Sequence, residues 1–431
     1  MITVMDNLIR YTDRYYILTR KGDNTMNVEL NSGQKDCLTK LLDWWNHKLD
    51  YQQVFSISGP AGSGKTFLIR VLVDQIPSIR MDDVLFVAYV GKAALNLSKS
   101  GLNASTIHSA IYHPIDVVTT RKDKDGKVMM NEGRPIKDIT VKFVLKEELD
   151  KDYKLIVVDE APMVDKRVAT DLLSFGIPII ALGDLNQLPP VIGDPYFLTD
   201  PDALLTEVIR QKADSPILAL SQHIIRNPYP RLASGNYKNQ LFIVKKKDFM
   251  AKYQNMLTIA DAVICGRNST RNELNKLIRD MYFRQQGMRE ISELALGDKL
   301  ICRKNNWMIQ KEGIFLINGL IGRVECIYFE DANSKIIPID FKPEFMEDSF
   351  EHIELSKKFF FGNNFEKEWL KTHHHRGNLF EYGYAITCHL SQGSQYDTVI
   401  VFNERIGDID FYRQWLYTAV TRASKKLLLL V

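Results

Sequence analysis

A glycine-rich segment at residues 59–66 has residue types and spacing suited to binding phosphate. It reads Gly-Pro-Ala-Gly-Ser-Gly-Lys-Thr, fits the pattern GxxxxGK[ST], and lies between an expected strand at 54–57 and an expected helix at 67–73. In this context backbone N–H groups and a helix N-terminus hold the phosphates of a nucleoside triphosphate, the lysine neutralises them and the threonine hydroxyl binds Mg²⁺. A chance glycine turn would not require that strand and helix. The residues expected to bind the nucleotide are Gly59, Pro60, Ala61, Gly62, Ser63, Gly64, Lys65 and Thr66.

Two adjacent carboxylates follow another candidate for a buried strand. Residues 155–158 are Leu-Ile-Val-Val, and Asp159 and Glu160 come directly after them. Because ligands bind at the carboxyl ends of the strands in open α/β sheets, we expect both carboxylates to face the nucleotide. Asp159 would hold Mg²⁺ and Glu160 would take the proton of the attacking water. Taken alone, the pair is also compatible with capping of the next helix, but its combination with Lys65 favours catalysis.

The elements that would position these residues predict an α/β fold. Strand candidates at 54–57, 84–89, 155–158 and 177–182 alternate with helical patterns, which is typical of a parallel sheet. The first helix is expected after the capping signal at 31–34, with apolar periodicity through 37–45. A second α/β set runs from 218 to 281, is interrupted near Gly297 by a strand-rich stretch, and resumes at 385. The chain is therefore expected to contain two α/β units, each with an insertion.

The insertion in the first unit is predicted to be a β-hairpin. Residues 117–120 and 128–130 are candidate strands, and a charged stretch with an Asp-Gly turn joins them. Its basic tip could contact a nucleic-acid junction, although a plain solvated turn would have the same sequence. The tip residues are Arg121, Lys122, Lys124 and Lys127.

Composition narrows the classes of protein. Of the 431 residues, 56 are Lys or Arg and 53 are Asp or Glu, so the net charge of +3 does not by itself indicate nucleic acid. The five cysteines lack the paired spacing of zinc sites, iron–sulfur clusters or disulfide frameworks, and the triplet 373–375 of histidines is expected on a solvated loop rather than at a metal. No apolar run approaches the ~20 residues of a membrane span, and the first 20 residues are too charged for a secretory signal, so we expect an intracellular protein.

Ordered segments of the chain resemble the motifs of superfamily 1 helicases. Asp159–Met163 resembles motif II, and Gly183-Asp184 followed by Gln187–Pro190 resembles motif III. Within the superfamily, the hairpin and Ile317–Val324 resemble the RecD-like and Dda-like branch, which moves 5′→3′ on single-stranded DNA. The resemblance covers roughly residues 34–431. Residues 32–35 resemble the Q motif, which reads adenine, and residues 104–109 resemble a segment that contacts the DNA strand. Residues 206–211 resemble motif IV, residues 385–395 motif V and residues 417–423 motif VI.

This resemblance implies ATP and Mg²⁺ as cofactors, and single-stranded DNA and its junctions with duplex as partners of a chain expected to be monomeric. Gln34 would read adenine, and two arginines would reach the γ-phosphate. The implied catalytic residues are Lys65, Asp159, Glu160, Gln187, Arg210 and Arg422. The implied contacts with the DNA strand are made by Ser105, Thr106, His108, Thr387, His389 and Ser391.

The implied fold is α/β, with two RecA-like parallel-sheet P-loop domains in tandem, each carrying a small insertion. The expected boundaries are 1–23 for an N-terminal extension, 24–111 with 151–195 for the first, ATP-binding domain, 112–150 for the hairpin acting as a wedge, 196–293 with 380–431 for the second domain, and 294–379 for an SH3-like β-rich insertion.

Three positions depart from the branch, and two other functions share its motifs. Val90-Gly91-Lys92 stands where a Pro-Thr pair is usual, Leu390 replaces a usual lysine and Gln395 a usual glutamate, so each could weaken or redirect one strand contact.

The resemblance implies an ATP-dependent DNA helicase that unwinds duplex. A RecD-like subunit of a nuclease complex would show the same motifs, with the nuclease on a separate chain. A nucleotide-gated clamp that binds DNA without moving is the third possibility, and it predicts ATP hydrolysis that single strands do not stimulate.

Overall fold

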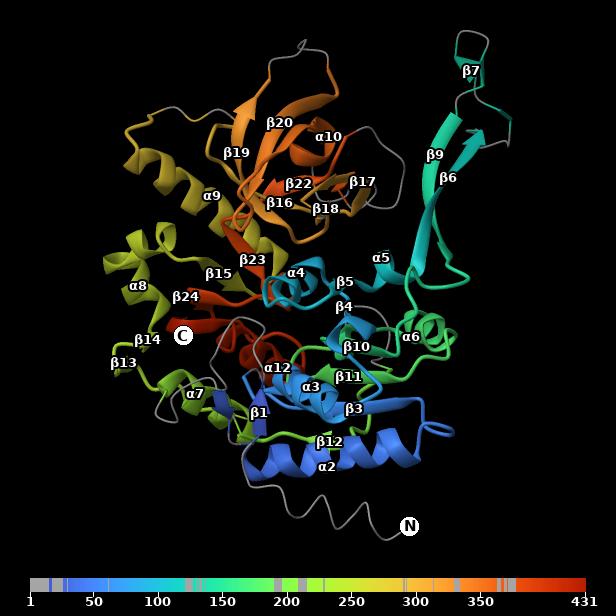
Figure 1. The fold of residues 1–431 in the computed structure, drawn as a ribbon. Helices are drawn as coiled ribbons and strands as arrows, with labels where there is room; N and C mark the ends of the chain where they lie inside the picture. Colours follow the sequence, from blue (N-terminus) through green and yellow to red (C-terminus); the bar gives the residue numbers. More distant parts are fainter. Residues whose placement is uncertain are drawn as a thin grey trace. The chain divides into compact units, whose positions relative to one another are not determined.

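The chain divides into two compact units in the computed structural model. Figure 1 labels the helices and strands along the chain. Unit 1 comprises residues 1–89, 96–110 and 148–215, and unit 2 comprises residues 90–95, 111–147 and 216–431. The structure describes residues 15–17, 26–28, 30–60, 62–120, 127–128, 130–131, 134–135, 137–189, 196–207, 215–227, 229–289, 291, 293–312, 314–328, 334–362, 366–367, 370 and 377–431.

Unit 1 is built on a six-stranded parallel sheet with strand order β12-β3-β11-β10-β4-β5. Its central strands are apolar and buried along their length, as expected where helices cover both faces of a parallel sheet. The register places the ends of β3, β10 and β11 at one edge, so the residues that follow these strands gather there. The strands are β3 (Val54–Ser58), β4 (Val84–Ala88), β5 (Ala104–Thr106), β10 (Leu155–Asp159), β11 (Ile179–Gly183) and β12 (Ala203–Leu204).

Helix α2 (Ser32–His47) begins where the sequence predicted. The Asn31 side chain accepts a hydrogen bond from the Gln34 backbone, and the Gln34 side chain accepts one from the Asn31 backbone, which is a capping box. The apolar face of α2 buries Trp44 completely. The other elements here are β1 (Tyr15–Ile17) paired antiparallel with β2 (Met26–Val28), α3 (Lys65–Gln75), η1 (Met81–Asp83), α4 (Gly91–Lys99), α5 (Ile107–Ile111), η2 (Ala161–Met163) and α6 (Lys166–Leu173).

The inserted hairpin has a different strand pairing from the one predicted. β6 pairs antiparallel with β9 over nine residue pairs, so the prediction that residues 117–120 pair with 128–130 was wrong. A turn at Asp125-Gly126 would leave room for only about three pairs, whereas residues 137–145 supply a long strand rich in β-branched residues. The strands are β6 (Tyr112–Thr120), β9 (Lys137–Leu145) and a smaller pair, β7 (Met130–Asn131) with β8 (Arg134–Pro135).

Unit 2 contains a second six-stranded sheet, ordered β13-β14-β25-β24-β15-β23 and parallel except between β13 and β14. The buried Trp415 of α12 and Phe249 of α8 belong to its core. The strands are β13 (Gly235–Tyr237), β14 (Leu241–Val244), β15 (Ala262–Cys265), β23 (Ala385–Thr387), β24 (Tyr396–Phe402) and β25 (Ala423–Leu430). The helices are α7 (Pro216–Arg226), α8 (Lys246–Lys252), η3 (Gln254–Thr258), α9 (Asn268–Gln285), η4 (Cys388–Ser391) and α12 (Ile409–Val420).

Between α9 and β23 the chain forms a β-rich insertion (residues 299–382). Its five-stranded antiparallel sheet has the order β21-β20-β19-β16-β22, and a bridge between Leu355 and Asn378 brings the chain before β22 back to β21. Phe341, Phe350 and Phe380 are buried in its core. The elements are β16 (Lys299–Cys302), β17 (Asn306–Lys311), β18 (Ile314–Leu316), β19 (Ile321–Ile327), β20 (Ile336–Pro343), β21 (Phe350–Ser356), α10 (Lys357–Phe360) and β22 (Phe380–Tyr382).

The α/β class predicted from the sequence is confirmed, because each unit has its own six-stranded, largely parallel sheet. All five cysteines are free thiols, and four of them are buried. Within the described residues, no group of three or more His, Cys, Asp or Glu side chains is placed to hold a metal, and the histidine triplet 373–375 lies outside those residues. In the same part of the chain, every helix is too short or too polar to cross a membrane.

Candidate functional site

The glycine-rich loop connects β3 to α3 at the carboxyl edge of the sheet in unit 1. Gly62 and Gly64 have φ angles of +84° and +85°, a region that other residues adopt only at a cost. At Gly59 a Cβ atom would come within 2.8 Å of the carbonyl oxygen of Leu205 and of the Ser63 hydroxyl. The glycines are therefore required by the backbone path. Ala61 and Pro190 lie outside the described residues.

Lys65 is the first residue of α3, and its side chain turns back over the loop. Its Nζ donates to the carbonyl oxygens of Gly59 at 2.6 Å and Pro60 at 3.2 Å. Both partners are neutral, so the loop holds the ammonium without cancelling its charge. Thr66 follows in the first turn of α3 and is partly exposed. The Ser63 hydroxyl is buried and makes no hydrogen bond within the described part of the chain.

Gln34 links the start of α2 to the phosphate-binding loop. Its side-chain oxygen accepts the capping bond from Asn31, and its Nε2 donates to the Ser63 carbonyl at 3.2 Å. Only 1% of Gln34 is exposed. The structure thus brings Gln34 to the loop, and its contact with adenine stays a prediction.

Asp159 and Glu160 lie at the end of β10, at the same edge as the loop. Burial raises the pKa of Asp159 above its ordinary range, although the Lys65 ammonium and the backbone N–H of Glu160 act in the opposite direction. The Asp159 side chain is half-buried, and a cation bound beside it would favour its ionised form. Glu160 has φ +51° and ψ +41°, the left-handed region, so its backbone is strained where the carboxylate leaves the strand.

The segment after β11 completes this edge. A side chain at Gly183 would overlap Pro162 and Leu198, so the strand end must be glycine. Asp184 is 1% exposed and accepts hydrogen bonds from the backbone and side-chain nitrogens of Asn186 at 3.0 and 3.2 Å. The turn that these bonds form carries Gln187, whose buried Oε1 has no partner within the described residues.

These groups fit a nucleoside triphosphate and a divalent cation. The loop offers a cationic side chain held by neutral carbonyls, and buried Ser63 and Gln187 oxygens without hydrogen-bond partners in the described chain. Beside them lies the half-buried carboxyl of Asp159, next to the Lys65 charge. Oxygen ligands of this kind suit Mg²⁺. The structure therefore brings together Gln34, Gly59, Ser63, Lys65, Asp159, Glu160 and Gln187.

The two predicted γ-phosphate arginines have different outcomes. Arg210 lies outside the described residues, together with most of the motif IV segment. Arg422 belongs to unit 2, is 4% exposed, and donates to Thr418 O at 3.0 Å, Ser394 O at 3.1 Å and Thr421 Oγ1 at 3.3 Å. All of these acceptors are neutral, and no carboxylate in the described chain forms an ion pair with Arg422.

The predicted strand-contacting residues of unit 1 lie at the end of β5. Ser105 donates to the carbonyl of Thr106, whose hydroxyl accepts from the Ser109 backbone at 3.1 Å and so caps α5. The His108 ring lies 5.8 Å from that of Tyr89. Burial lowers the pKa of His108, so its imidazole is neutral at pH 7 and would bind a strand through hydrogen bonds rather than charge.

The predicted strand-contacting residues of unit 2 lie in η4 or directly before it. Thr387 ends β23, and burial lowers the pKa of His389, whose ring lies 6.2 Å from that of Phe411. Ser391 is fully buried, and its hydroxyl donates to the carbonyl of Cys388 at 2.6 Å. In this structure the Ser391 side chain therefore stabilises the η4 turn from its buried side. Direct contact of Thr387, His389 and Ser391 with DNA stays a prediction.

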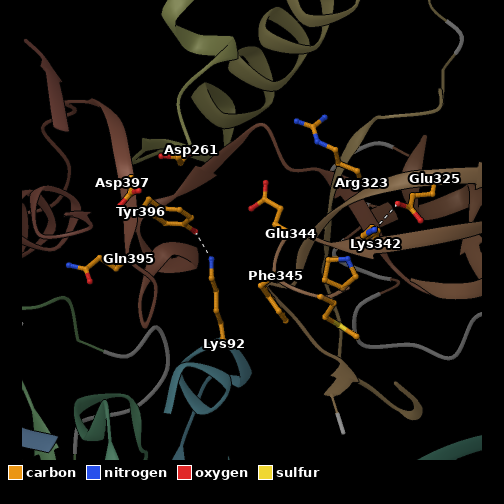
Figure 2. Close-up of a pocket in the computed structure, with 12 residues that line it drawn as sticks. Lys92, Asp261, Arg323, Glu325, Lys342, Glu344, Phe345, Gln395, Tyr396 and Asp397 are labelled. Carbon is orange, nitrogen blue, oxygen red and sulfur yellow. Dashed lines mark hydrogen bonds and ion pairs between the residues drawn. The ribbon is translucent and has the colours of Figure 1, made fainter. Parts of the chain in front are cut away.

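Two of the three departures from the family pattern lie in one pocket of unit 2. Lys92 and Gln395 line a cavity of about 660 Å³, where Lys92 Nζ donates to the Tyr396 hydroxyl at 3.1 Å (Figure 2). The same ammonium lies 4.3 Å from the Tyr396 ring centre. A side chain at Gly91 would overlap Ile317. The contacts of Lys92 and the close approach of Ile317 to Gly91 depend on tertiary structure and could not be predicted from sequence spacing.

The basic residues predicted at the hairpin tip are mostly untested. Arg121, Lys122 and Lys124 lie outside the described residues, and Lys127 is exposed. The hairpin strands themselves carry exposed apolar side chains, namely Ile115, Phe143 and Val144. The wedge therefore stays a prediction.

Sequence reasoning missed Glu404, which organises the start of α9. Its Oε2 accepts from the backbone N–H groups of Gly266 at 2.5 Å and Arg267 at 2.9 Å, and its Oε1 accepts from Thr270 Oγ1 at 2.6 Å. Burial alone would raise the pKa of Glu404, but these donors together lower it below the ordinary range. A carboxylate two residues after the apolar run of β24 was the available signal.

Comparison with known families agrees with this geometry. A model described as an AAA domain matches residues 29–247, about half of the chain, and one described as a UvrD-like helicase C-terminal domain matches residues 382–430. The first match contains the phosphate-binding loop and both carboxylates. The second contains the segment with Arg422.

Two curated relatives are DNA helicases. The chain is 27% identical over 277 residues to the ATP-dependent DNA helicase dda of Enterobacteria phage T4, covering 59% of this chain and 58% of that protein. It is 24% identical over 392 residues to the ATP-dependent RecD2 DNA helicase of Deinococcus radiodurans, covering 86% and 46%. The chain thus spans about half the length of these relatives. A solved structure of Bacteroides Pif1 bound to single-stranded DNA shares the fold, with a TM-score of 0.50, 16% identity, and coverage of 94% of this chain and 92% of that one.

Proposed function

The chain belongs to the AAA-domain family and to the superfamily 1 helicases of the Dda-like and RecD-like type, and from this premise we propose that it is an ATP-dependent DNA helicase. We propose further that it moves 5′→3′ on single-stranded DNA and unwinds duplex. The observation that carries the proposal is the grouping of Lys65, Asp159 and Glu160 at one sheet edge, beside buried oxygens that lack hydrogen-bond partners in the described chain.

In the proposed reaction the residues of unit 1 hold the triphosphate and activate water. The Lys65 ammonium and the loop N–H groups bind the phosphates, and Glu160 accepts the proton of the attacking water. Mg²⁺ bound by the Thr66 hydroxyl and the Asp159 carboxylate would neutralise phosphate charge. Gln187 would orient the water or the γ-phosphate through its amide, whose Oε1 has no partner among the described residues.

Arg422 and Arg210 are proposed to stabilise the charge that develops on the transferred phosphate. The neutral hydrogen-bond partners of Arg422 support this role, because they hold the guanidinium in place and leave its charge available. An arginine that served only the fold would be expected to pair with a carboxylate when buried to this extent.

The DNA strand is proposed to pass over both units. Ser105, Thr106 and His108 would contact it from unit 1, and Thr387, His389 and Ser391 would contribute from unit 2. If nucleotide turnover changes the approach of the two units, alternating contact moves the strand. We propose that the chain acts as a monomer.

The proposal is tested by strand displacement from duplexes that carry only a 5′ tail or only a 3′ tail. We expect ATP-dependent displacement from the 5′-tailed substrate, and loss of both hydrolysis and displacement in Lys65→Ala, with single-strand binding retained. Hydrolysis that single strands do not stimulate would instead indicate a clamp. Displacement only from the 3′-tailed substrate would contradict the proposed polarity.

A further inference from the structure

Helix α9 carries a stripe of buried polar residues on one face. Arg271, Asn275 and Arg279 are spaced four residues apart, so their side chains project from the same side of the helix. They are 6%, 4% and 9% exposed. Charged groups are rarely buried to this degree unless specific partners hold them. The partners of this stripe lie where the chain enters and leaves the β-rich insertion.

At the point where the chain enters the insertion, Arg279 holds Asp298, the residue directly before β16. Its Nε and NH2 groups donate to the two oxygens of the fully buried carboxylate at 2.6 and 2.8 Å. The same carboxylate accepts from the Tyr384 hydroxyl at 2.9 Å and from the Ala295 backbone at 2.8 Å. Two parallel hydrogen bonds fix the relative orientation of the two groups as well as their distance.

At the point where the chain leaves the insertion, Arg271 and Asn275 hold β22 and β23. Arg271 NH2 lies 3.1 Å from the Glu381 carboxylate, which Arg303 and Lys367 also approach, at 3.0 and 3.3 Å. The Asn275 amide donates to the carbonyl of Ala385 at 3.0 Å and accepts from its N–H at 2.9 Å. Because β23 is the edge strand of its sheet, Asn275 supplies the partner that a further strand would have given.

The chemistry of these contacts indicates orientation rather than stability. Replacing a buried ion pair by apolar side chains of similar volume is often neutral or stabilising, so a buried pair is weak support for a stabilising role. Fixed geometry is what apolar packing does not supply. Two cationic side chains of the insertion also contact the second α/β unit. Lys299 of β16 donates to the Asp261 carbonyl, directly before β15, at 3.3 Å. The Arg323 guanidinium of β19 lies 4.9 Å from the ring centre of Tyr282 on α9.

We propose that Arg271, Asn275 and Arg279, the α9 clamp, hold the β-rich insertion in one orientation on the second α/β sheet, so that the two move as a single rigid body. Two chain crossings alone would leave a hinge, since relative motion is the default between domains with a modest interface. The α9 clamp prevents this motion because it contacts the chain both where it enters and where it leaves the insertion. Its residues are positioning residues for unwinding, and this consequence rests on the proposed function, whereas the rigidity itself does not.

Rigidity is tested by the distance between two spin labels, measured by double electron–electron resonance. Cys326 is the one thiol that is not fully buried, so Cys326→Ser gives a suitable background for labels at Lys247→Cys on α8 and Glu351→Cys on β21, both exposed positions. We expect one narrow distance that is the same without ligand, with single-stranded DNA, and with DNA plus a non-hydrolysable ATP analogue. A broad distribution or a second distance in any state overturns the proposal, and this measurement needs no clamp variant to fold.

The contribution of the clamp is tested by the paired change Arg279→Gln with Asp298→Asn. The new amide at position 298 has one acceptor oxygen where the carboxylate had two, so it can accept from Tyr384 or from Ala295, and the charged, two-bonded pair with position 279 is lost. We expect a broadened label distance, ATPase within about two-fold of the parent, and base pairs displaced per ATP lowered by about three- to thirty-fold, the range for changes that alter coupling between sites. Arg279→Met with Asp298→Leu, which leaves no buried charge unpaired, should show the same pattern.

The matched control is Arg284→Gln with Asp280→Asn, an exposed pair at 3.2 Å on the same helix. It should change neither the label distance nor the displacement per ATP. A narrow, unchanged label distance in both folded clamp variants would refute the role of the clamp. If the parent chain displaces no duplex in any substrate, the proposed function fails, and the label distances still decide whether the body is rigid.

Discussion

At the residue scale, Glu160 is held in a conformation that its residue type does not favour. Its φ of +51° lies in the left-handed region, which costs an L-residue roughly 1–2 kcal/mol. A glycine would adopt this backbone without that cost. The position therefore retains a glutamate for its carboxylate, in agreement with the proposed role as general base beside Lys65 and Asp159.

Glu160→Gln should bind ATP and Mg²⁺ but hydrolyse ATP slowly, with turnover lowered by about 10²–10⁴-fold. The amide keeps the shape and the strained backbone but cannot accept a proton from water. Single-turnover hydrolysis and fluorescent-nucleotide binding measure the two properties separately. An equal loss of nucleotide binding would show that the carboxylate is a structural ligand instead.

Arg422→Ala should lower ATP turnover by about 10³-fold, with nucleotide and single-strand affinity little changed, because arginine fingers act on the transition state. Removing the side chain also removes the hydrogen bonds that it donates to the Thr418 and Ser394 carbonyls, so thermal melting must be measured alongside; we expect the free energy of unfolding to fall by about 1–3 kcal/mol. Arg413→Ala, a half-buried arginine on the same α12 that bonds the Ile225 carbonyl, is the control and should keep full turnover. Full ATPase activity in a folded Arg422→Ala protein would exclude the proposed role.

At the scale of elements, the start of α9 depends on a residue far away in sequence. Glu404 follows β24, and its carboxylate accepts two backbone N–H groups and a hydroxyl from the first turn region of α9. A negative charge at a helix N-terminus is favourable, and buried hydrogen bonds strengthen it. The carboxylate therefore ties β15, α9 and β24 together at one end of the second sheet.

The stability of unit 2 should fall in acid partly because of Glu404. The pKa of this carboxyl is lowered in the folded protein, so its stabilisation is fully present above the ordinary value of about 4.3 and is lost as the pH falls through the folded value. Glu404→Gln should lower the free energy of unfolding by about 2 kcal/mol at pH 7 and by progressively less towards pH 3. Urea unfolding across this range measures it. Glu351→Gln, at an exposed carboxylate, is the control with an expected effect under about 0.5 kcal/mol. A difference that does not shrink in acid would show that the effect is not due to charge.

The elements also show what could be predicted from the sequence. The phosphate-binding loop and the start of α2 were predicted because their signals are local: glycines at fixed offsets, and a capping box within four residues. The pairing of β6 with β9 was missed because a strand's partner is chosen by competition among distant segments. The spacing of Arg271, Asn275 and Arg279 was readable, but Asp298, Glu381 and Ala385 become their partners only through the fold.

At the scale of the whole molecule, the proposed activity separates into stepping and strand separation. The residues proposed to bind the triphosphate lie in unit 1 and Arg422 lies in unit 2, while the β6–β9 hairpin contains none of the residues proposed to touch nucleotide. Stepping along a strand should therefore be independent of the hairpin. Separating a base pair costs on the order of 1.4 kcal/mol per step, and an obstacle beside the moving strand makes each step meet that cost.

Replacing residues 121–136 by Asn-Gly should impair duplex displacement and leave ATPase on single strands within about two-fold of the parent. Thr120 and Lys137 form the last pair of the β6–β9 ladder, so a two-residue type I′ turn can close the strands there without changing the register. The change removes the basic tip, β7 and β8 while keeping all nine pairs. Matched assays of ATPase, translocation on bare single strands and displacement of a 5′-tailed duplex measure the uncoupling.

The control places the same Asn-Gly turn at Lys238-Asn239 between β13 and β14, where both residues already have positive φ angles, and should change none of the three activities. Undiminished displacement by the shortened hairpin would place the wedge elsewhere, and loss of ATPase in the same variant would show that the hairpin supports the motor rather than the separation of strands.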